Sequence, residues 1–195
     1  MNGIHEHTLS LLAHYLDHFP CESSRFTLLQ RQLGSDPALF ERSNMTGHVT
    51  SSAAVLTPNG AEILLIHHRF LKKWLTPGGH YEGPGDLFES ALREIEEETG
   101  VTDAGVHPWT VINNIPLDID SHDVPARPEK NEGAHMHHDF LFLAAVPTIG
   151  GLQARLSEVH DAVWAPVAEL EKSSDRRVLL LHQKLVNIGA ISGSC

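Results

Sequence analysis

Residues 87–99 are predicted to form an amphipathic helix that ends at Gly100. Apolar side chains recur at four-residue steps along one face: Leu87, Ala91 and Ile95. On the opposite face, Glu94 precedes Glu97 and Glu98 by three and four residues, so the three carboxylates lie together. Like charges at this spacing repel, and in the last turns of a helix the dipole also disfavours them. The segment must therefore pack against a core on one side and find positive charge for the other.

The acidic face needs more positive charge than the helix itself carries. Arg93 supplies one positive charge and cannot offset all of the acid. A hard cation with oxygen ligands would do so, and Mg²⁺ is the common choice where phosphates complete the coordination shell. The alternative is a solvated acidic face with no ligand, which is the usual state of an isolated charge run. The preceding Pro77-Gly78-Gly79 favours the cation, because its backbone can approach a bound group closely and its carbonyls add oxygen ligands.

Residues 79–101 resemble the Nudix box, GX5EX7REUXEEXGU with U aliphatic. The following residues match it at the required spacing: Gly79, Arg93, Glu94, Ile95, Glu97, Glu98, Gly100 and Val101. One position departs, because Gly85 stands where the early glutamate is expected, with Asp86 beside it. The resemblance implies an α/β fold, a Nudix-type α/β/α sandwich with a mixed β-sheet over residues 46–190. Residues 1–45 are expected to be an N-terminal helical extension, since Leu9, Leu12 and Leu16 recur at helical spacing.

The resemblance also implies roles for the residues of the box. Its helix glutamates bind divalent metal, which makes Glu94, Glu97 and Glu98 the expected ligands, with the Gly78 carbonyl as an addition. The expected metal is Mg²⁺, with Mn²⁺ as the alternative. Arg93 is expected to orient the glutamates, and either Asp86 or Glu89 could replace the missing early glutamate. The expected catalytic group therefore consists of Glu98, Glu97 and Arg93, in which Glu98 is the first candidate for the general base.

The implied reaction is hydrolysis of a phosphoanhydride bond in a nucleoside diphosphate linked to another moiety. ADP-ribose, nucleotide sugars, dinucleotides and (deoxy)nucleoside triphosphates all fit this description. The chain offers no convincing Ser-His-Asp or Cys-His set, and metal-activated water requires no protein nucleophile. Two alternatives share the fold: a non-catalytic nucleotide-binding Nudix module, and an enzyme resembling isopentenyl-diphosphate isomerase. The isomerase chemistry uses a cysteine beside the box region, and residues 22–194 contain none.

Three residues are candidates for substrate binding. Gly79 lies in the glycine loop, and Arg69, which shortly precedes that loop, could reach a phosphate or be a solvated hairpin charge. His137 belongs to the segment His135-Met-His137-His138-Asp139. On a strand, His135, His137 and Asp139 would share a face that could bind zinc; otherwise these histidines line the substrate cleft or occupy a strand end.

The remaining elements follow from local patterns. Strands are expected at 49–56 and 61–66, joined by the hairpin signal Pro58-Asn59-Gly60, and further strands at 106–114, 137–146 and 159–164. A last helix is expected over roughly 174–188. Residues 115–134 read as a long loop that carries substrate specificity. Glu158, before the late strand, is a further carboxylate that could lie near the metals or be an ordinary surface residue.

Charge and cysteine content restrict the partners and the compartment. The formal net charge of −11 argues against binding to a nucleic-acid backbone, although a divalent cation can still bring in a small anionic substrate. The sequence contains no run of about 18 apolar residues, so no membrane span is predicted. Cys21 and Cys195 lie outside any CxxC spacing, so we expect a reducing, cytoplasmic setting rather than a disulfide framework. A homodimer is the expected assembly, on the habits of the family.

Overall fold

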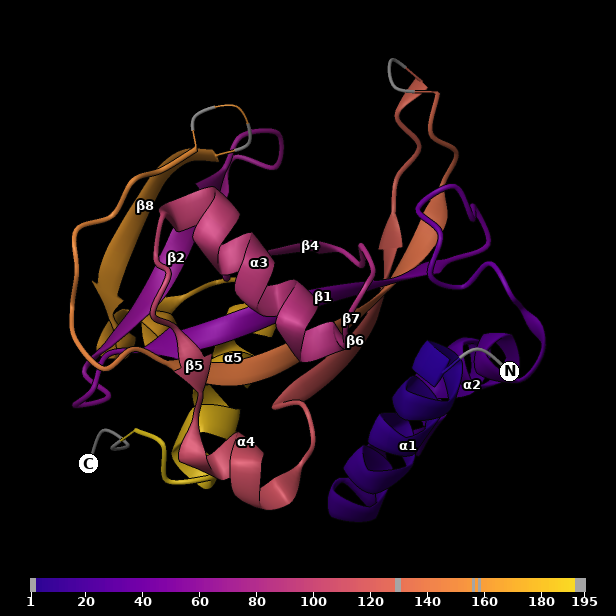
Figure 1. Ribbon diagram of the computed structural model, residues 1–195, viewed down its shortest axis with the longest axis horizontal. Coiled ribbons are helices and arrows are strands. Elements are labelled where there is room, and N and C mark those ends of the chain that lie inside the picture. The colour runs from indigo at the N-terminus through magenta and orange to yellow at the C-terminus, as the bar shows by residue number, and fades with distance from the viewer. Residues whose placement is uncertain (1–2, 129–130, 156, 158, 192–195) are drawn as a thin grey trace.

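The computed structural model describes residues 3–128, 131–155, 157 and 159–191, which form an eight-stranded mixed sheet with helices on both faces (Figure 1). The strands are β1 (His48–Leu56), β2 (Glu62–His68), β3 (Lys73–Leu75), β4 (Gly78–His80), β5 (Gly105–Val106), β6 (Asp118–Val124), β7 (His135–Ala145) and β8 (Val159–Pro166). The expected α/β sandwich with a mixed sheet is therefore confirmed.

The central strand β1 organises the sheet. All of its residues are buried, and it runs parallel to β7 over its whole length, with His48 opposite His137 and Leu56 opposite Ala145. Its other edge pairs with two antiparallel strands: β2 near Leu56, and the short β4 over residues 50–52. The outer strands β3 and β8 pair with β2, while β5 and β6 pair with β7. This arrangement places β4 beside the first half of β1.

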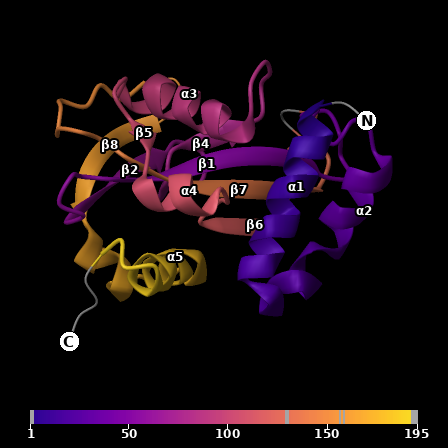
Figure 2. The same cartoon turned by 60° about the horizontal axis from the view of Figure 1, so that its bottom comes forward.

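Helices cover the two faces of the sheet (Figure 2). Helix α3 (Leu87–Thr99) lies on one face, and its apolar residues Leu87, Ala91 and Ile95 have no exposed surface. Helix α5 (Arg176–Asn187) lies on the other face, and α4 (Pro108–Asn113) and the short helix η3 (Val167–Lys172) complete the set. The predicted helix at 87–99 is confirmed, and Gly100 ends it in the left-handed conformation. No helix in the described part of the chain is long and apolar enough to cross a bilayer.

The N-terminal segment consists of α1 (Gly3–His18), the 3₁₀ helix η1 (Pro20–Phe26) and α2 (Thr27–Ser35). These helices lie at one flank of the sheet, and their apolar side chains join the same core as β1, β7 and α3 (Figure 2). The shared buried residues of this segment are Leu11, Leu12, Tyr15, Phe26, Leu29 and Leu33. The helical character of the extension is as expected, whereas its status as a separate unit from 46–190 stays a prediction.

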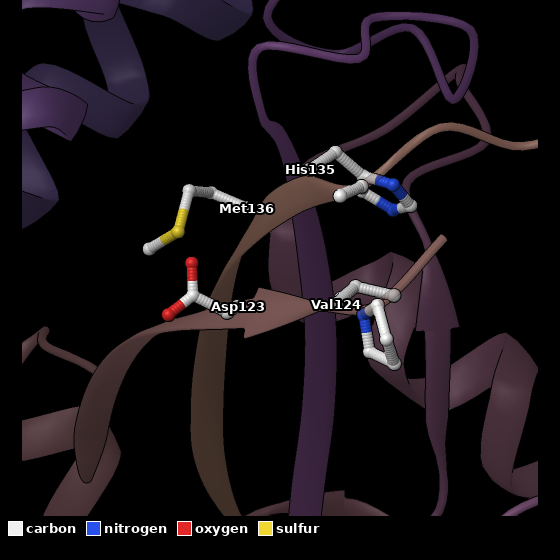
Figure 3. A pocket seen from close by; sticks show the side chains of 6 residues that line it. Asp123, Val124, His135 and Met136 are labelled. Atoms are coloured by element: carbon white, nitrogen blue, oxygen red, sulfur yellow. The ribbon is translucent and has the colours of Figure 1, made fainter.

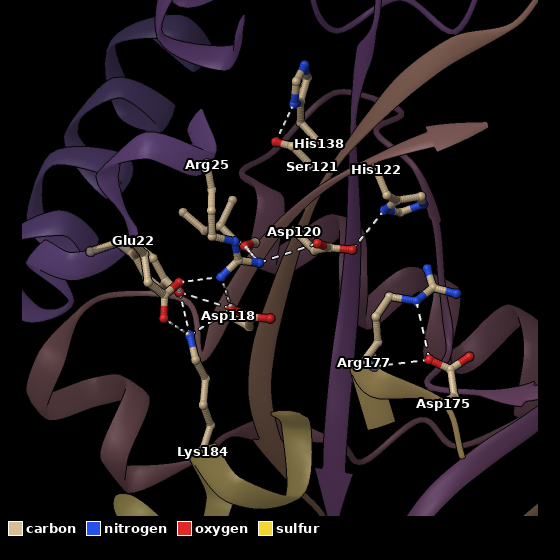
Figure 4. Close-up of polar contacts among 12 residues, drawn as sticks. Glu22, Arg25, Asp118, Asp120, Ser121, His122, His138, Asp175, Arg177 and Lys184 are labelled. Atoms are coloured by element: carbon tan, nitrogen blue, oxygen red, sulfur yellow. Dashed lines mark hydrogen bonds and ion pairs between the residues drawn. The ribbon is translucent and has the colours of Figure 1, made fainter. Parts of the chain in front are cut away.

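A partly buried ionic network fastens the N-terminal segment to the rest of the fold (Figure 4). The Lys184 ammonium of α5 lies 2.7 Å from Asp118 Oδ1 of β6 and 3.1 Å from Glu22 Oε1 of η1. The same ammonium donates to the Tyr15 hydroxyl of α1, and that hydroxyl donates to Glu22 at 2.6 Å. Burial and the two carboxylates raise the pKa of Tyr15, so its hydroxyl stays protonated. Four separate elements thus meet at one ammonium.

Two sequence predictions are wrong. Residues 106–114 are not a strand, because β5 ends at Val106 and residues 108–113 form α4. His107 caps this helix by accepting from Trp109 N at 3.1 Å, and Pro108 occupies its first position. Residues 115–134 are not one long loop either, because β6 pairs with β7 from Asp118 to Val124. The hairpin at Pro58-Asn59-Gly60 is as predicted, since it joins the antiparallel strands β1 and β2.

Candidate active site

The glycine strand β4 brings two of the predicted metal ligands together. The backbone N–H of Gly78 donates to Glu98 Oε2 at 3.0 Å, and Glu98 is only 4% exposed. The carboxylate of Glu94 lies against Gly79, where a Cβ would be 2.5 Å from Glu94 Cδ. A side chain at this position would displace that carboxylate. These two glutamates of α3 are therefore both in contact with the two glycines of β4: Glu98 with Gly78, and Glu94 with Gly79.

The third predicted ligand, Glu97, has a different environment. Its carboxylate is half exposed and lies 3.0 Å from Arg155 Nη1, which is equally exposed. The backbone N–H of Arg155 also donates to the carbonyl oxygen of Glu98, at 3.1 Å, so the segment containing Arg155 covers the end of α3. An exposed ion pair of this kind contributes little free energy. Glu97 is therefore available to another cation at small cost.

Arg93 contacts the loop that leads into α3. Its guanidinium donates to the carbonyl oxygen of Glu82 and to Ser90 Oγ, the latter at 3.2 Å. This arrangement ties the loop between β4 and α3 to the helix. The predicted role of Arg93, orientation of the glutamates, stays a prediction.

The departure from the box at Gly85 has a local explanation. Asp86 caps α3 by accepting from Glu89 N at 2.8 Å, while Glu89 Oε2 accepts from Asp86 N at 3.0 Å. A Cβ on Gly85 would collide with Glu89 Oε2, and Gly85 has a φ of 123°. A glutamate at this position would therefore disrupt the reciprocal cap. Asp86 and Glu89 cap the start of the helix, and the expectation that either replaces the early glutamate stays a prediction.

The two remaining substrate-binding candidates lie apart in the fold. Arg69 is in the exposed turn that joins β2 to β3, and its role in phosphate binding stays a prediction. His137 lies on β7 at the far end of β4, next to His80. The ring centroids of His137 and His80 are 5.2 Å apart, and Gly79 immediately precedes His80.

His137 belongs to a group of imidazoles from four strands. The ring of His48 lies 4.8 Å from those of His135 and His137 and 5.0 Å from that of His80. His122 of β6 is 5.7 Å from His137 between ring centroids. Burial, and secondarily the neighbouring imidazoles, lowers the pKa of His137 to about 2, and burial lowers the pKa of His80 to about 4. Burial also lowers the pKa of His48, so these three rings are neutral at neutral pH.

Of the three residues predicted to share a zinc-binding face, His135 and His137 lie together in the structure, whereas Asp139 has other partners. His135 and His137 do come together, but the two oxygens of Asp139 accept hydrogen bonds from Thr50 at 2.9 Å and Ser52 at 2.6 Å. His48 instead completes the group of three. Sequence reasoning missed His48 and His80, because only the pairing of β1 with β7 and β4 brings them to His137. Glu158 lies outside the described residues.

An open pocket adjoins the histidines (Figure 3). It has a volume of about 390 Å³ and is lined by Asp123, Val124, Pro125, Ala134, His135 and Met136. Its walls are the end of β6 and the beginning of β7, with His135 and Val124 on one side and Met136 on the other. The pocket does not include the glutamates of α3, and of the clustered histidines only His135 lines it.

The donor set on α3 suits a hard divalent cation. Mg²⁺ and Mn²⁺ prefer oxygen ligands, and the carboxylates of Glu94 and Glu98 both lie against the backbone of β4. Glu97 lies on the same helix face one turn after Glu94. The residues present therefore fit such an ion.

The NUDIX domain model matches residues 47–183, well over half of the chain. Among curated proteins, the probable DHNTP pyrophosphohydrolase of Lactococcus lactis subsp. cremoris (strain MG1363) is 33% identical over 92 residues. That match covers 47% of this chain, and the chain spans about half (51%) of the relative's length.

Solved structures share the fold. A Caenorhabditis elegans Ap4A hydrolase, in a binary complex, superposes with a TM-score of 0.54 at 18% identity, covering 73% of this chain and 97% of that chain. The Escherichia coli dihydroneopterin triphosphate pyrophosphohydrolase superposes with a TM-score of 0.53 at 14% identity, covering 71% and 97%. At these identities the likeness concerns the fold alone.

Proposed function

The chain belongs to the Nudix family, and on that premise we propose that it is a Mg²⁺-dependent hydrolase of a phosphoanhydride bond. Its substrate would be a nucleoside diphosphate linked to another moiety. Curated and structural relatives named as pyrophosphohydrolases support this reaction class.

One observation carries the proposal: Glu94 and Glu98 of α3 both lie against the glycine strand β4. These two carboxylates are therefore directed at the backbone of Gly78 and Gly79, where a diphosphate could approach closely. A Cβ at position 79 would displace the Glu94 carboxylate, so the glycine supports this close approach.

The residues of the chain divide the work as follows. Glu94, Glu97 and Glu98, with the Gly78 carbonyl, would hold Mg²⁺, with Mn²⁺ as the alternative. The bound ion would neutralise the diphosphate and acidify a water molecule. Glu98 is the proposed general base, and the Gly78 N–H holds its carboxylate in place at 3.0 Å. Arg93 fixes the loop that precedes α3 through the Glu82 carbonyl.

The relatives indicate substrates with a diphosphate linkage, and several classes of compound share that chemistry. ADP-ribose, nucleotide sugars and (deoxy)nucleoside triphosphates fit the shared diphosphate chemistry. Relatives named for DHNTP and Ap4A add dihydroneopterin triphosphate and dinucleotides to the panel. Arg69, Gly79 and His137 are the proposed substrate contacts.

A hydrolysis screen over that panel tests the proposal. Wild-type protein with Mg²⁺ should release product from at least one compound, and EDTA should abolish the release. Glu98→Gln should lower kcat by about 10²-fold or more, as expected for loss of a general base. Glu97→Gln should weaken metal binding and activity. Glu96→Gln is the matched control, because Glu96 is exposed on the same helix but outside the box positions.

The second candidate is a nucleotide-binding module without catalysis, which the complete helix glutamates argue against and the departure at Gly85 leaves open. It predicts that wild type, Glu97→Gln and Glu98→Gln are equally inactive across the panel while still binding nucleotide. Calorimetric titration of the same compounds therefore separates the two functions.

The proposal includes a cytoplasmic setting and a homodimer. Cys21 is an exposed free thiol, which suits a reducing compartment; Cys195 lies outside the described residues. Size-exclusion chromatography with light scattering would measure the oligomeric state.

A further inference from the structure

Three histidines from two neighbouring strands converge at the end of the sheet. His48 begins β1, and His135 and His137 begin β7, where His48 is directly opposite His137. Each offers a ring nitrogen, and these nitrogens all lie within 4.8 Å of one another. His48 is 1% and His135 6% exposed, so two of the three imidazoles are withdrawn from solvent.

Backbone carbonyls fix the tautomers of two of these rings. His48 Nδ1 lies 3.1 Å from the Asn44 carbonyl oxygen, and His135 Nδ1 lies 2.8 Å from that of Gly133. A carbonyl oxygen can only accept, so in each ring the proton that faces it is on Nδ1. Nε2 is therefore the nitrogen through which His48 and His135 can each offer a lone pair.

The surrounding described residues offer too few hydrogen-bond donors to these two Nε2 atoms. His135 Nε2 lies 3.1 Å from His137 Nε2, so His137 can donate its single proton to His135. His48 Nε2 is buried, and it has no hydrogen-bond partner among the described residues. A buried acceptor left unpaired is unfavourable. A cation placed among the ring nitrogens that His48, His135 and His137 offer would give each of these nitrogens a partner.

The spacing and surroundings suit a transition metal. With a metal–nitrogen distance of about 2.0–2.1 Å, nitrogens of a tetrahedral zinc site lie about 3.3–3.4 Å apart. His135 and His137 are already at 3.1 Å, and small ring rotations would bring His48 in from within 4.8 Å. Metal-bound histidines commonly donate their second N–H to a carbonyl, as His48 and His135 do here.

The charges around the cluster permit a cation. Arg42 and Glu132 are the nearby charged groups, and they form an ion pair of 2.8 Å with each other. Glu132 also pairs with Arg127 at 2.6 Å. The ring centroid of His80 lies 5.0 Å from that of His48 and 5.2 Å from that of His137. The ring centroid of His122 lies 5.7 Å from that of His137, and His122 Nδ1 is 3.0 Å from Asp120.

We propose that His48, His135 and His137 bind one divalent transition-metal ion, with Zn²⁺ the best match, at a site separate from the carboxylates of α3. Neutral imidazoles select Zn²⁺ over Mg²⁺, because Mg²⁺ prefers oxygen ligands. The two sites therefore differ in ligand chemistry and can be filled independently.

Zinc binding by the 195-residue chain tests this proposal, with any affinity tag removed because tag histidines bind zinc themselves. Protein freed of metal with a chelator is titrated with Zn²⁺ against a chromophoric competitor, and the product is assayed by elemental analysis. Wild type should bind one equivalent tightly. His137→Gln and His48→Gln should each weaken this binding by at least about 100-fold. Mutation of a residue that only hydrogen-bonds to a metal ligand already lowers metal affinity by about 10–100-fold.

Two control variants separate the histidine site from other sources of zinc. His14→Gln removes an exposed histidine of α1 and should leave zinc binding unchanged. Glu94→Gln removes a carboxylate from α3 and should also leave it unchanged, whatever it does to hydrolysis. Circular dichroism confirms the fold of each variant, and Co²⁺ substitution should give a visible absorption band that His137→Gln loses.

Two results would overturn the proposal. One is that wild type binds zinc no more tightly than the His48→Gln and His137→Gln variants do. The other is that Glu94→Gln, and not the histidine variants, abolishes the uptake. Because the readout is metal binding, a failure of the hydrolase proposal leaves this result interpretable.

Discussion

Replacement of Gly79 by alanine tests the geometry of the proposed hydrolytic site most directly. An alanine Cβ would lie 2.5 Å from Glu94 Cδ, whereas nonbonded carbon atoms prefer about 3.5–4.0 Å. The Glu94 carboxylate must therefore withdraw from β4 by about 1 Å, and a misplacement of that size can cost about 10²-fold in rate. The colliding group is the end of a flexible side chain, so the fold should persist.

The expected result for Gly79→Ala is a fall of about 100-fold in kcat/KM, equivalent to about 2.7 kcal/mol of transition-state stabilisation. Calorimetric titration with Mn²⁺ should show weaker binding, and thermal unfolding should change little. Gly105→Ala is the matched control, because no atom lies within 4 Å of its Cβ position in β5. Full activity and unchanged Mn²⁺ affinity in Gly79→Ala, with the alanine present, would refute the placement of Glu94 against β4.

Three further perturbations address the rest of the fold. Lys184→Met leaves the Asp118 carboxylate without its buried ammonium, and it should lower the free energy of unfolding in urea by about 3–5 kcal/mol. The matched change Lys172→Met removes an exposed ion pair and should leave the free energy of unfolding close to that of wild type; equal effects of the two changes would contradict the network. Leu29→Ala in the N-terminal segment should cost about 2–5 kcal/mol, because Leu29 has no exposed surface; a change under 1 kcal/mol would mean that the segment is not part of the core. Burial lowers the pKa of His107 below its ordinary 6.5, so the unfolded chain binds more protons and stability falls as the pH drops through 6.5. His107→Asn keeps a capping acceptor without titrating, so its stability should depend less on pH in that window, and an unchanged pH dependence would count against the cap.

The elements predicted best from the sequence are those with local causes. The helix at 87–99 needs only its own apolar spacing, the cap at Asp86 and the stop at Gly100. The hairpin at Pro58-Asn59-Gly60 likewise follows from turn residues alone. The metal-ligand prediction was possible for the same reason: the box fixes which carboxylates share a helix face, and β4 is only a few residues away.

The errors fall where distant partners decide the structure. Val111 and Ile112 suggested a strand, but they are 62% and 81% exposed on a short helix that His107 and Pro108 begin. The segment Asp118–Val124 is too polar to be recognised as a strand, and its pairing with β7 is what orders it. Pattern reasoning assumes that apolar residues are buried and polar ones are in loops, and both segments break that assumption.

The histidine cluster also depends on distant partners, and it gives the N-terminal segment a structural role. The Asn44 carbonyl fixes the tautomer of His48, and Gln32 of α2 lies 2.9 Å from His138 Nε2 through its Oε1. Gln32 also donates to the Gly47 carbonyl at 2.9 Å, immediately before β1 begins. The segment is held against the sheet by a shared core and by Lys184, so it cannot move freely as a lid. Gln32 and Asn44 instead position the beginning of β1 and the His48 ring, while the three proposed zinc ligands themselves come from β1 and β7.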